Sequence, residues 1–185
     1  DRLMKIVEDL DMITKLESGV MDLKLKALDL RGTVEEAIQE LEIQARDKGV
    51  TLRNELADDV VVMADKGRLM QVLMNLLNNA IIYGREGGTC TVSSYPLDEQ
   101  VLVEVNDDGI GISEEHLPRL FERFYRVGKS RARNEGGSGL GLAIVKHIIE
   151  AHGQTISVKS REGVGTTFSF TLQKAPQRLG RIASS

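Results

Sequence analysis

The sequence predicts an α+β fold, a two-layer α/β sandwich in which helices cover one face of a mixed sheet. Helical spacings and short β-type runs occupy separate stretches of the chain, and most of the β-type runs come in pairs joined by turn signals. Hydrophobic residues make up 41% of the 185, enough for a packed core. The length suits one ordinary domain, or one domain with an attached element.

The first stretch, "DRLMKIVEDLDMITKLESGV", predicts a helix with a narrow apolar seam. The seam residues follow one another at spacings of 3, 4, 3 and 7: Leu3, Ile6, Leu10, Ile13 and Val20. Such a helix is not stable alone, so we expect a partner helix from a longer protein. The alternative is an ordinary amphipathic helix that packs on its own domain.

A linker around Met21–Leu30 leads to a second predicted helix. Thr33 and Glu36 form a capping-box pattern at its start, and Gly49 ends it after Lys48. Strands are expected at 50–57 and 60–64, and Asp65 is the predicted N-cap of the following helix. The remaining expected elements are two strands at 89–95 and 101–106 with a turn at 97–100, a helix at 140–152, strands at 155–160 and 166–173, and a disordered tail from Pro176.

Composition excludes several classes of protein. No apolar run reaches the 18 or so residues of a membrane span, and the start lacks the order of a signal peptide, so a soluble piece is expected. Cys90 is the only cysteine, which excludes an internal disulfide framework. Residues 119–133, here called the basic lid, carry six basic residues and one acidic one in a chain of net charge −4. This distribution favours a small polyanion and argues against nucleic acid.

The stretch "VLMNLLNNAII" (72–82) places polar amides on a helix that otherwise looks buried. Asn75 and Asn79 are four residues apart and share a side with Val72, Leu76 and Tyr83. A buried amide without partners costs roughly 1–3 kcal/mol. These two therefore need hydrogen-bond partners or a ligand.

Two glycine motifs suggest where that ligand lies. "VNDDGIGI" (105–112) puts a carboxylate at a strand end before Gly109 and Gly111, which allow sharp turns and close approach of the backbone to a flat ligand. "GGSGLGLAIVK" (136–146) precedes a helix whose free N–H groups suit an anion. A dinucleotide-binding fold is excluded, because its glycine fingerprint follows a strand and the second motif does not. A phosphate-binding Walker loop is also excluded, because the sequence has no Gly-Lys-Ser/Thr that opens a helix after a strand.

The order of these motifs, followed by "GVGTTF", resembles the ATP-binding domain shared by sensor histidine kinases, gyrase, MutL and the ninety-kilodalton heat-shock chaperone. "FERFYRV", "GSGLGLAIVKHIIEAHG" and "VEDLDMITKLESG" are similar to bacterial sensor histidine kinases in particular. The resemblance runs from about Leu3 to Leu172. It implies the second helix of a dimerisation and phosphoacceptor hairpin at 1–25, the catalytic domain at 26–174 and a tail at 175–185.

The resemblance also implies roles for single residues. Asp107 accepts a hydrogen bond from the adenine amine, Tyr83 lies against the adenine, and Thr166 reaches it through water. Asn79 offers its oxygen to Mg²⁺, Asn75 lines the same phosphate site, and catalysis falls to these two and Arg126, which meets the γ-phosphate. The other residues expected at the nucleotide are those of the glycine motifs: Gly109, Gly111, Ile112, Gly137, Gly139, Leu140 and Gly141.

Residue 75 bears on the reaction. A hydrolase of this superfamily needs a carboxylate there to activate water, so asparagine favours a kinase. The acceptor histidine of the family is not visible, because His116, His147 and His152 lie in no such context. Ile82 occupies the position at which most relatives carry a lysine near the phosphates.

The cofactors implied are ATP and Mg²⁺. The partners implied are the protein's own acceptor hairpin, a second copy in a homodimer and a response-regulator receiver domain. The full protein is expected in the cytoplasmic membrane, with this piece in the cytoplasm. Two alternatives stay open: an ATP-gated conformational module without phosphotransfer, and an anti-sigma-type serine kinase.

Overall fold

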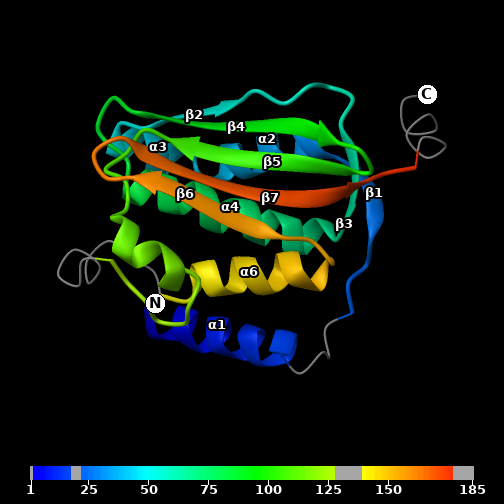
Figure 1. Cartoon of the computed structure of the whole chain (residues 1–185), viewed down its shortest axis with the longest axis horizontal. Helices are drawn as coiled ribbons and strands as arrows, with labels where there is room; N and C mark the ends of the chain where they lie inside the picture. The colour runs from blue at the N-terminus through cyan, green and yellow to red at the C-terminus, as the bar shows by residue number, and fades with distance from the viewer. Residues whose placement is uncertain (1, 18–21, 128–138, 177–185) are drawn as a thin grey trace.

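The computed structural model describes residues 2–17, 22–127 and 139–176, and these form a layer of helices against a mixed sheet (Figure 1). This confirms the predicted α+β sandwich. The helices are α1 (Arg2–Glu17), α2 (Leu30–Glu40), α3 (Glu42–Lys48), α4 (Lys66–Ile82), the 3-10 helix η1 (Glu114–Arg119) and α6 (Gly141–Ala151). The strands are β1 (Lys26–Asp29), β2 (Thr51–Asn54), β3 (Val61–Ala64), β4 (Thr89–Leu97), β5 (Gln100–Asp107), β6 (Ile156–Arg161) and β7 (Gly165–Lys174).

The sheet has the order β1-β3-β7-β5-β4-β2, and β6 also pairs with β7. All of these pairs are antiparallel except β2 with β4, which is parallel. The central pair is β5 with β7, in register from Gln100 opposite Gln173 to Asp107 opposite Thr166. Strand β7 thus connects the two halves of the sheet.

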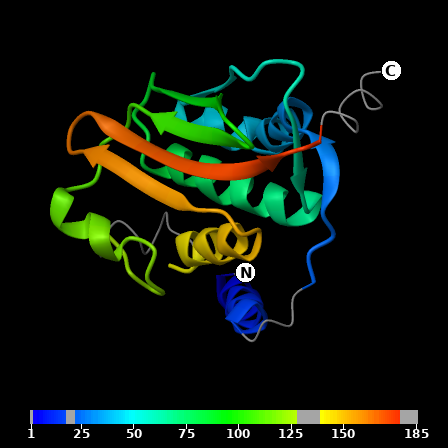
Figure 2. The same ribbon diagram turned by 45° about the vertical axis from the view of Figure 1, so that its right-hand side comes forward.

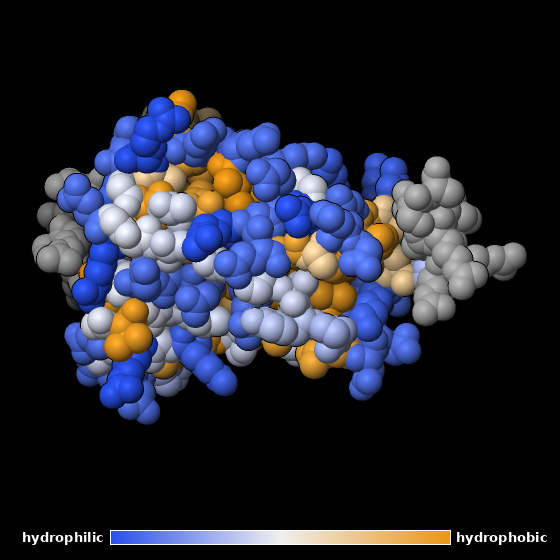
Figure 3. All heavy atoms as spheres, turned by 90° about the horizontal axis from the view of Figure 1, so that it is seen from above, coloured by the Kyte–Doolittle hydropathy of each residue, from blue (hydrophilic) through white to orange (hydrophobic). Residues whose placement is uncertain are grey.

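Alternation along the central strands decides which face the helices cover. In β5 every second residue from Val101 is buried, and in β7 Phe168 and Phe170 face the same way. Helices α4 and α6 pack on that face and against each other (Figure 2). Seen from above, the surface is mostly hydrophilic, with hydrophobic residues in small groups (Figure 3). Within the described ranges, no helix is long and apolar enough to cross a membrane.

Helix α2 begins earlier than predicted, and the capping box is wrong. Asp29 is the N-cap, and its carboxylate accepts from the Gly32 N–H at 3.2 Å. Thr33 already lies in the helix and donates to the Asp29 carbonyl at 2.8 Å. The expected single helix to Lys48 is two helices that meet at Leu41. Gly49 ends the second with a left-handed φ of 78°, as predicted.

Strand β1 lies inside the stretch that was expected to be a linker. Its four residues "KALD" carry little local signal, and they become a strand by pairing with β3. Helix η1 was likewise not predicted, because a 3-10 turn of six residues containing Pro118 has no apolar periodicity to read. The expected tail beyond residue 176 lies outside the described residues.

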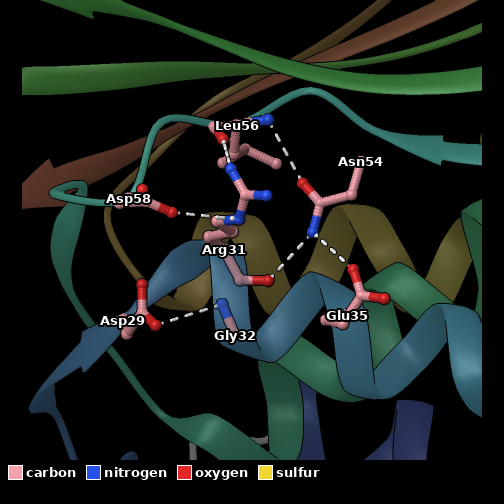
Figure 4. A network of polar contacts seen from close by, with 7 residues as sticks. All are labelled: Asp29, Arg31, Gly32, Glu35, Asn54, Leu56 and Asp58. Carbon is pink, nitrogen blue, oxygen red and sulfur yellow. Dashed lines mark hydrogen bonds and ion pairs between the residues drawn. The ribbon is translucent and has the colours of Figure 1, made fainter.

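Arg31 joins the start of α2 to the connection between β2 and β3 (Figure 4). It donates to the Leu56 carbonyl at 2.6 Å and pairs with the carboxylate of Asp58 at 3.3 Å. Asn54 donates to the Arg31 carbonyl at 3.0 Å and to Glu35 at 3.1 Å, and its oxygen accepts from the Leu56 N–H at 3.2 Å. The network thus provides partners for the backbone carbonyl and N–H of Leu56, which lies beyond the end of β2.

Helix α1 packs against α6 on its own domain, in agreement with the alternative interpretation of its seam (Figure 1). Ile13 is buried there, and the neighbouring Met12 sulfur accepts from the Gln71 amide of α4. The other end of the helix remains open: Leu3 is 67% exposed and Val7 is 53% exposed. The predicted seam residue Val20 lies outside the described residues.

Asp65 is the N-cap of α4, as predicted. Its carboxylate accepts from the Arg68 N–H at 3.1 Å and from the Lys24 N–H at 3.0 Å. Burial raises the pKa of this carboxyl, but the two backbone hydrogen bonds and the charge of Arg68 outweigh it, so the pKa lies below its ordinary value of 3.8. Ionised Asp65 therefore stabilises the fold.

Asp65→Ala should lower the free energy of unfolding at pH 7 by about 1 kcal/mol, the usual cost of a lost N-cap. Asp65→Asn is the matched control, because it keeps the cap acceptor and removes only the charge. A lowered folded pKa contributes stability above the unfolded pKa and loses it as the pH falls through the folded value. Urea titrations from pH 7 to pH 2 should show a constant difference between wild type and Asp65→Asn well above pH 3.8, and a difference that shrinks as the pH falls below 3.8 toward the lower pKa of the folded state. A difference independent of pH would contradict this.

Cys90 is fully buried in β4, and burial, with the nearby charges of Asp107 and Asp108, raises the pKa of its thiol to about 12. At pH 8 only about one molecule in ten thousand would carry the thiolate. A thiol reagent should therefore label the folded chain far more slowly than the chain in urea. Labelling of the folded chain at the rate of a free cysteine would contradict the buried position.

Candidate functional site

Four side chains form a polar row across one end of the sheet. Cys90 of β4 lies opposite Asp107 of β5, Asp107 opposite Thr166 of β7, and Thr166 opposite Ser160 of β6. Directly opposite residues in a sheet point to the same face, so the row lies on the side that the helices cover. Asp107 is 8% exposed and Thr166 is 6% exposed. A buried carboxylate and a buried hydroxyl thus lie side by side.

The environment of Asp107 perturbs its ionisation. Burial raises the pKa of this carboxyl; backbone N–H bonds from Gly109 and Thr166 oppose the rise, and the charge of Asp108 adds to it. The bond from Gly109 reaches Oδ1 at 2.9 Å. Desolvation is the largest of these causes, so the net pKa is above the ordinary value. Such a group at the end of a central strand is a candidate binding residue.

The glycines after Asp107 are required by neighbouring backbone. A Cβ on Gly109 would lie 2.4 Å from the Tyr83 carbonyl, and one on Gly111 would lie 2.1 Å from the Arg161 carbonyl. Gly111 also has a φ of 73°. The motif predicted to approach a ligand therefore packs against the end of α4 and against the β6–β7 turn. Ile112, the next residue, is half-buried against the core.

Helix α4 ends at this part of the site, and it packs against α6. Tyr83 is its C-cap, and its carbonyl accepts from the Ile110 N–H at 3.1 Å. Asn75 and Asn79 are half-buried further back along the helix. No residue within the described ranges hydrogen-bonds to either side-chain amide. Asn75 and Tyr83 are eight residues apart, or about 12 Å along the helix axis.

The N-terminus of α6 lies beside Asn75. A Cβ on Gly141, the first residue of α6, would lie 3.4 Å from the Asn75 oxygen. The preceding residue, Leu140, is completely buried and cannot cap the helix with its side chain. The first N–H groups of an α-helix have no partner within the helix, and no side chain among the described residues caps this one, which suits an anion.

The described part of the basic lid meets the second glycine motif. The Phe124 N–H donates to the Gly139 carbonyl at 2.9 Å, and a Cβ on Gly139 would lie 3.2 Å from Arg126 Nε. Phe121 anchors the lid by packing edge-on against Phe168, with ring centroids 6.1 Å apart. Phe124, by contrast, is 53% exposed. Gly137 lies outside the described residues.

The sequence did not indicate a cluster of polar and aromatic side chains at the start of the basic lid. The Tyr125 hydroxyl is hydrogen-bonded to His116 Nδ1, and the Arg119 guanidinium lies 4.7 Å from the centre of the Tyr125 ring. Arg119 also pairs with Glu122 at 2.9 Å. The cluster joins η1 to the chain just before Arg126. Its members are far from periodic in sequence, so no local signal reveals it.

Sequence reasoning also missed Ser160. Its hydroxyl accepts from the Ile112 N–H at 2.7 Å, donates to the Gly165 carbonyl at 2.9 Å and lies 2.7 Å from the Thr166 hydroxyl. It therefore links the 105–112 motif to the "GVGTTF" stretch. The serine stands five residues before Gly165 in "SREGVG", and only the strand register shows what it touches.

The histidines occupy structural positions. His152 accepts the Asp65 N–H at 3.1 Å and is hydrogen-bonded to the Ile148 carbonyl at 2.8 Å. Burial lowers the pKa of His147; Glu150 opposes the shift, and Arg123 and Lys146 add to it. Within the described ranges, no group of three or more His, Cys, Asp or Glu residues could hold a metal.

Comparison with known sequences gives a consistent result. Residues 64–176 match the family described as histidine kinase-, DNA gyrase B-, and HSP90-like ATPase. Sensor histidine kinase WalK of Bacillus subtilis is 37% identical over 174 residues, which is 93% of this chain and 28% of WalK. The histidine-protein kinase BaeS of Escherichia coli is 37% identical over 178 residues, covering 95% of this chain and 38% of BaeS.

Solved structures agree. Full-length ShkA in complex with AMPPNP matches 94% of this chain and 36% of its own, with a TM-score of 0.82 and 28% identity. Histidine kinase ThkA in complex with the response regulator TrrA matches 93% of this chain and 49% of its own, with a TM-score of 0.70 and 28% identity. The chain spans less than half of each of these four proteins. It belongs to the histidine kinase-, DNA gyrase B- and HSP90-like ATPase family, and within that family its relatives are the catalytic domains of sensor histidine kinases.

Proposed function

We propose that this chain binds Mg·ATP and transfers the γ-phosphate to a histidine on an acceptor hairpin, for relay to an aspartate of a response regulator. The observation that carries the proposal is the pairing of a buried acceptor with an open anion site. Asp107 lies at one end of α4, and the N-terminus of α6, which no described side chain caps, lies beside Asn75, about 12 Å back along α4. This spacing suits a nucleotide with its base at one end and its phosphates at the other.

The base end is built for an amine. Asp107, when ionised, only accepts hydrogen bonds, so it favours the exocyclic amine of adenine over a carbonyl at the same position. Tyr83 would lie against the base, and Thr166 would reach it through water. Gly109, Gly111 and Ile112 hold the chain that follows Asp107 in place.

The phosphate end combines an anion site with a basic lid. The N–H groups that follow Leu140 would meet phosphate oxygens, with Gly139 and Gly141 on either side and Gly137 earlier in the same motif. The Asn79 oxygen is the ligand we assign to Mg²⁺, which takes few protein ligands and completes its shell with water and phosphate. Arg126, beside Gly139, is placed for the γ-phosphate.

The reaction assigned is transfer to protein. Residue 75 is an amide, which cannot activate water as a carboxylate would, and ThkA was solved with a response regulator. We also propose that residues 1–25 are part of the hairpin that dimerises and carries the acceptor in the full protein. The full protein would be membrane-anchored, with this segment in the cytoplasm.

The proposed reaction is tested with γ-labelled ATP and a separately supplied acceptor hairpin. Label should appear on the hairpin as an acid-labile phosphate and not on this chain, whose histidines lie outside an acceptor context. ATP binding without transfer would favour an ATP-gated conformational module instead. Label on a serine of an added protein would favour an anti-sigma-type kinase.

Asp107→Asn should weaken ATP binding at least tenfold, about 1.4 kcal/mol, because the amide can present a donor to the adenine amine. The same change should not lower stability. Because the pKa of Asp107 is raised in the folded state, ionising this carboxyl makes the fold less stable as the pH rises from the unfolded toward the folded pKa. Removing the charge therefore relieves a penalty at pH 7. Calorimetric titration and thermal melting of one sample check both. A melting temperature lowered by several degrees would make Asp107 a structural residue.

A further inference from the structure

Phe124, within the basic lid, has a backbone conformation that its residue type rarely adopts. Its φ is 62°, in the left-handed region, where a bulky side chain is strained. The Phe124 N–H donates to the Gly139 carbonyl at 2.9 Å, whereas the Phe124 side chain is 53% exposed. Because that side chain lies half in solvent, its own packing gives the strained backbone little support. Contacts of neighbouring residues must hold this turn in place.

Tyr125, the next residue, is held on two sides. Its hydroxyl is hydrogen-bonded to His116 Nδ1, and the Arg119 guanidinium lies 4.7 Å from the centre of its ring. The other ring nitrogen, His116 Nε2, lies 3.4 Å from a carboxylate oxygen of Glu115, which only accepts. Nε2 therefore carries a hydrogen, and Nδ1 of the neutral ring accepts from the tyrosine hydroxyl.

His116 is fixed to the body of the domain. It lies in η1, which packs against β6, and its N–H donates to the Ser113 carbonyl at 3.0 Å. Leu117, the next residue of η1, packs against the hydrophobic core. The hydrogen bond between His116 and Tyr125 thus ties the basic lid to a turn that the core holds.

Arg126 directly follows this anchored tyrosine. A Cβ on Gly139 would lie 3.2 Å from Arg126 Nε, so the guanidinium lies beside the second glycine motif. The direction in which the Arg126 side chain leaves the backbone depends on the dihedral angles of Phe124 and Tyr125. Relaxation of the strained turn would therefore move the guanidinium away from Gly139.

We infer that Tyr125 and His116 are positioning residues, which hold the strained turn at Phe124 and so keep Arg126 directed at the γ-phosphate. The inference rests on the proposed function, which assigns Arg126 to that phosphate. The hydrogen bond between Tyr125 and His116 acts through Arg126 and involves no contact with the nucleotide. Its loss should therefore weaken only the interaction that Arg126 makes.

The test compares ATP with ADP, which lacks the γ-phosphate. Dissociation constants of both magnesium salts and the melting temperature are measured for the wild-type chain, Tyr125→Phe and Tyr95→Phe. Tyr125→Phe keeps the ring beside Arg119 and removes only the hydroxyl. ATP binding should weaken about fivefold, within the scale of one hydrogen bond, and ADP binding should stay unchanged. Tyr95, an exposed tyrosine of β4, is the matched control, and its variant should change neither constant.

The histidine side of the hydrogen bond gives a second pair of variants. His116→Leu removes the acceptor and should weaken ATP binding as Tyr125→Phe does, again without an effect on ADP. His116→Asn keeps an acceptor oxygen close to the position of Nδ1, so it should restore most of the affinity for ATP. This comparison still tests the hydrogen bond if Tyr125→Phe lowers the melting temperature.

A double variant shows whether the effect passes through Arg126. Arg126→Ala should weaken ATP binding at least tenfold, the scale of a hydrogen bond between charged groups, and leave ADP binding unchanged. Adding Tyr125→Phe to Arg126→Ala should then weaken ATP binding no further, because the residue that Tyr125 positions is already absent.

The outcomes distinguish two failures. If Tyr125→Phe weakens ATP and ADP equally or leaves both unchanged, or if its effect persists in the Arg126→Ala background, the inference is wrong. It is also wrong if His116→Asn binds ATP as weakly as His116→Leu. If Arg126→Ala alone leaves ATP binding unchanged, the proposed role of Arg126 fails, and this inference fails with it. A wild-type chain that binds neither nucleotide would overturn the proposed function itself.

Discussion

The register between β5 and β7 is the constraint on which the site depends. The two strands pair from Gln100 opposite Gln173 to Asp107 opposite Thr166, with the apolar residues of both facing the helices. A slip by one residue would turn the whole set, Asp107 and Thr166 included, to the solvent face. The hydrophobic core thus fixes the position of the polar row, because Phe168 and Phe170 cannot leave the interior without large loss of buried area.

The two ends of the site use different physics. At the end proposed for the base, a carboxylate is held at a desolvation cost, and glycines allow three backbone segments to approach so closely that no Cβ fits between them. At the end proposed for the phosphates, the groups come from the start of α6, the middle of α4 and the lid, and charge does more than close packing. Under this proposal the first end would recognise shape and hydrogen-bond polarity, whereas the second would respond to charge and salt.

Strong local signals predicted most of the fold. Asp65, as an N-cap, and the helical spacing of the apolar residues after it predicted α4. The alternation of apolar and polar residues predicted the central strands. The capping box at Thr33 failed because Asp29, four residues earlier, already caps the helix. Strand β1 exists only through its pairing with β3, which no local pattern encodes. The apolar seam of the first helix shows that a partner is needed but does not identify it, so α6 could not be chosen in advance.

The site was predictable to a different degree. The glycine motifs and asparagines stand out in sequence, and family resemblance supplied the role of each. Ser160 and the cluster of His116 with Tyr125 did not stand out, because their contacts join strands or turns that are distant in the chain. Side chains that support a site from behind carry no spacing rule, and only the assembled sheet brings them together.

The hydrogen bond from the Phe124 N–H to the Gly139 carbonyl has a consequence for how relatives of this domain can diverge. It joins Phe124, within the basic lid, to Gly139, so the ends of the segment between these two residues are held together whatever lies between them. Doubling the length of a closed loop costs only about 0.6 kcal/mol of closure entropy. Insertions and deletions between these two positions should therefore be nearly neutral for folding, which leaves that stretch free to vary in length and charge while the nucleotide motifs on both sides stay in place.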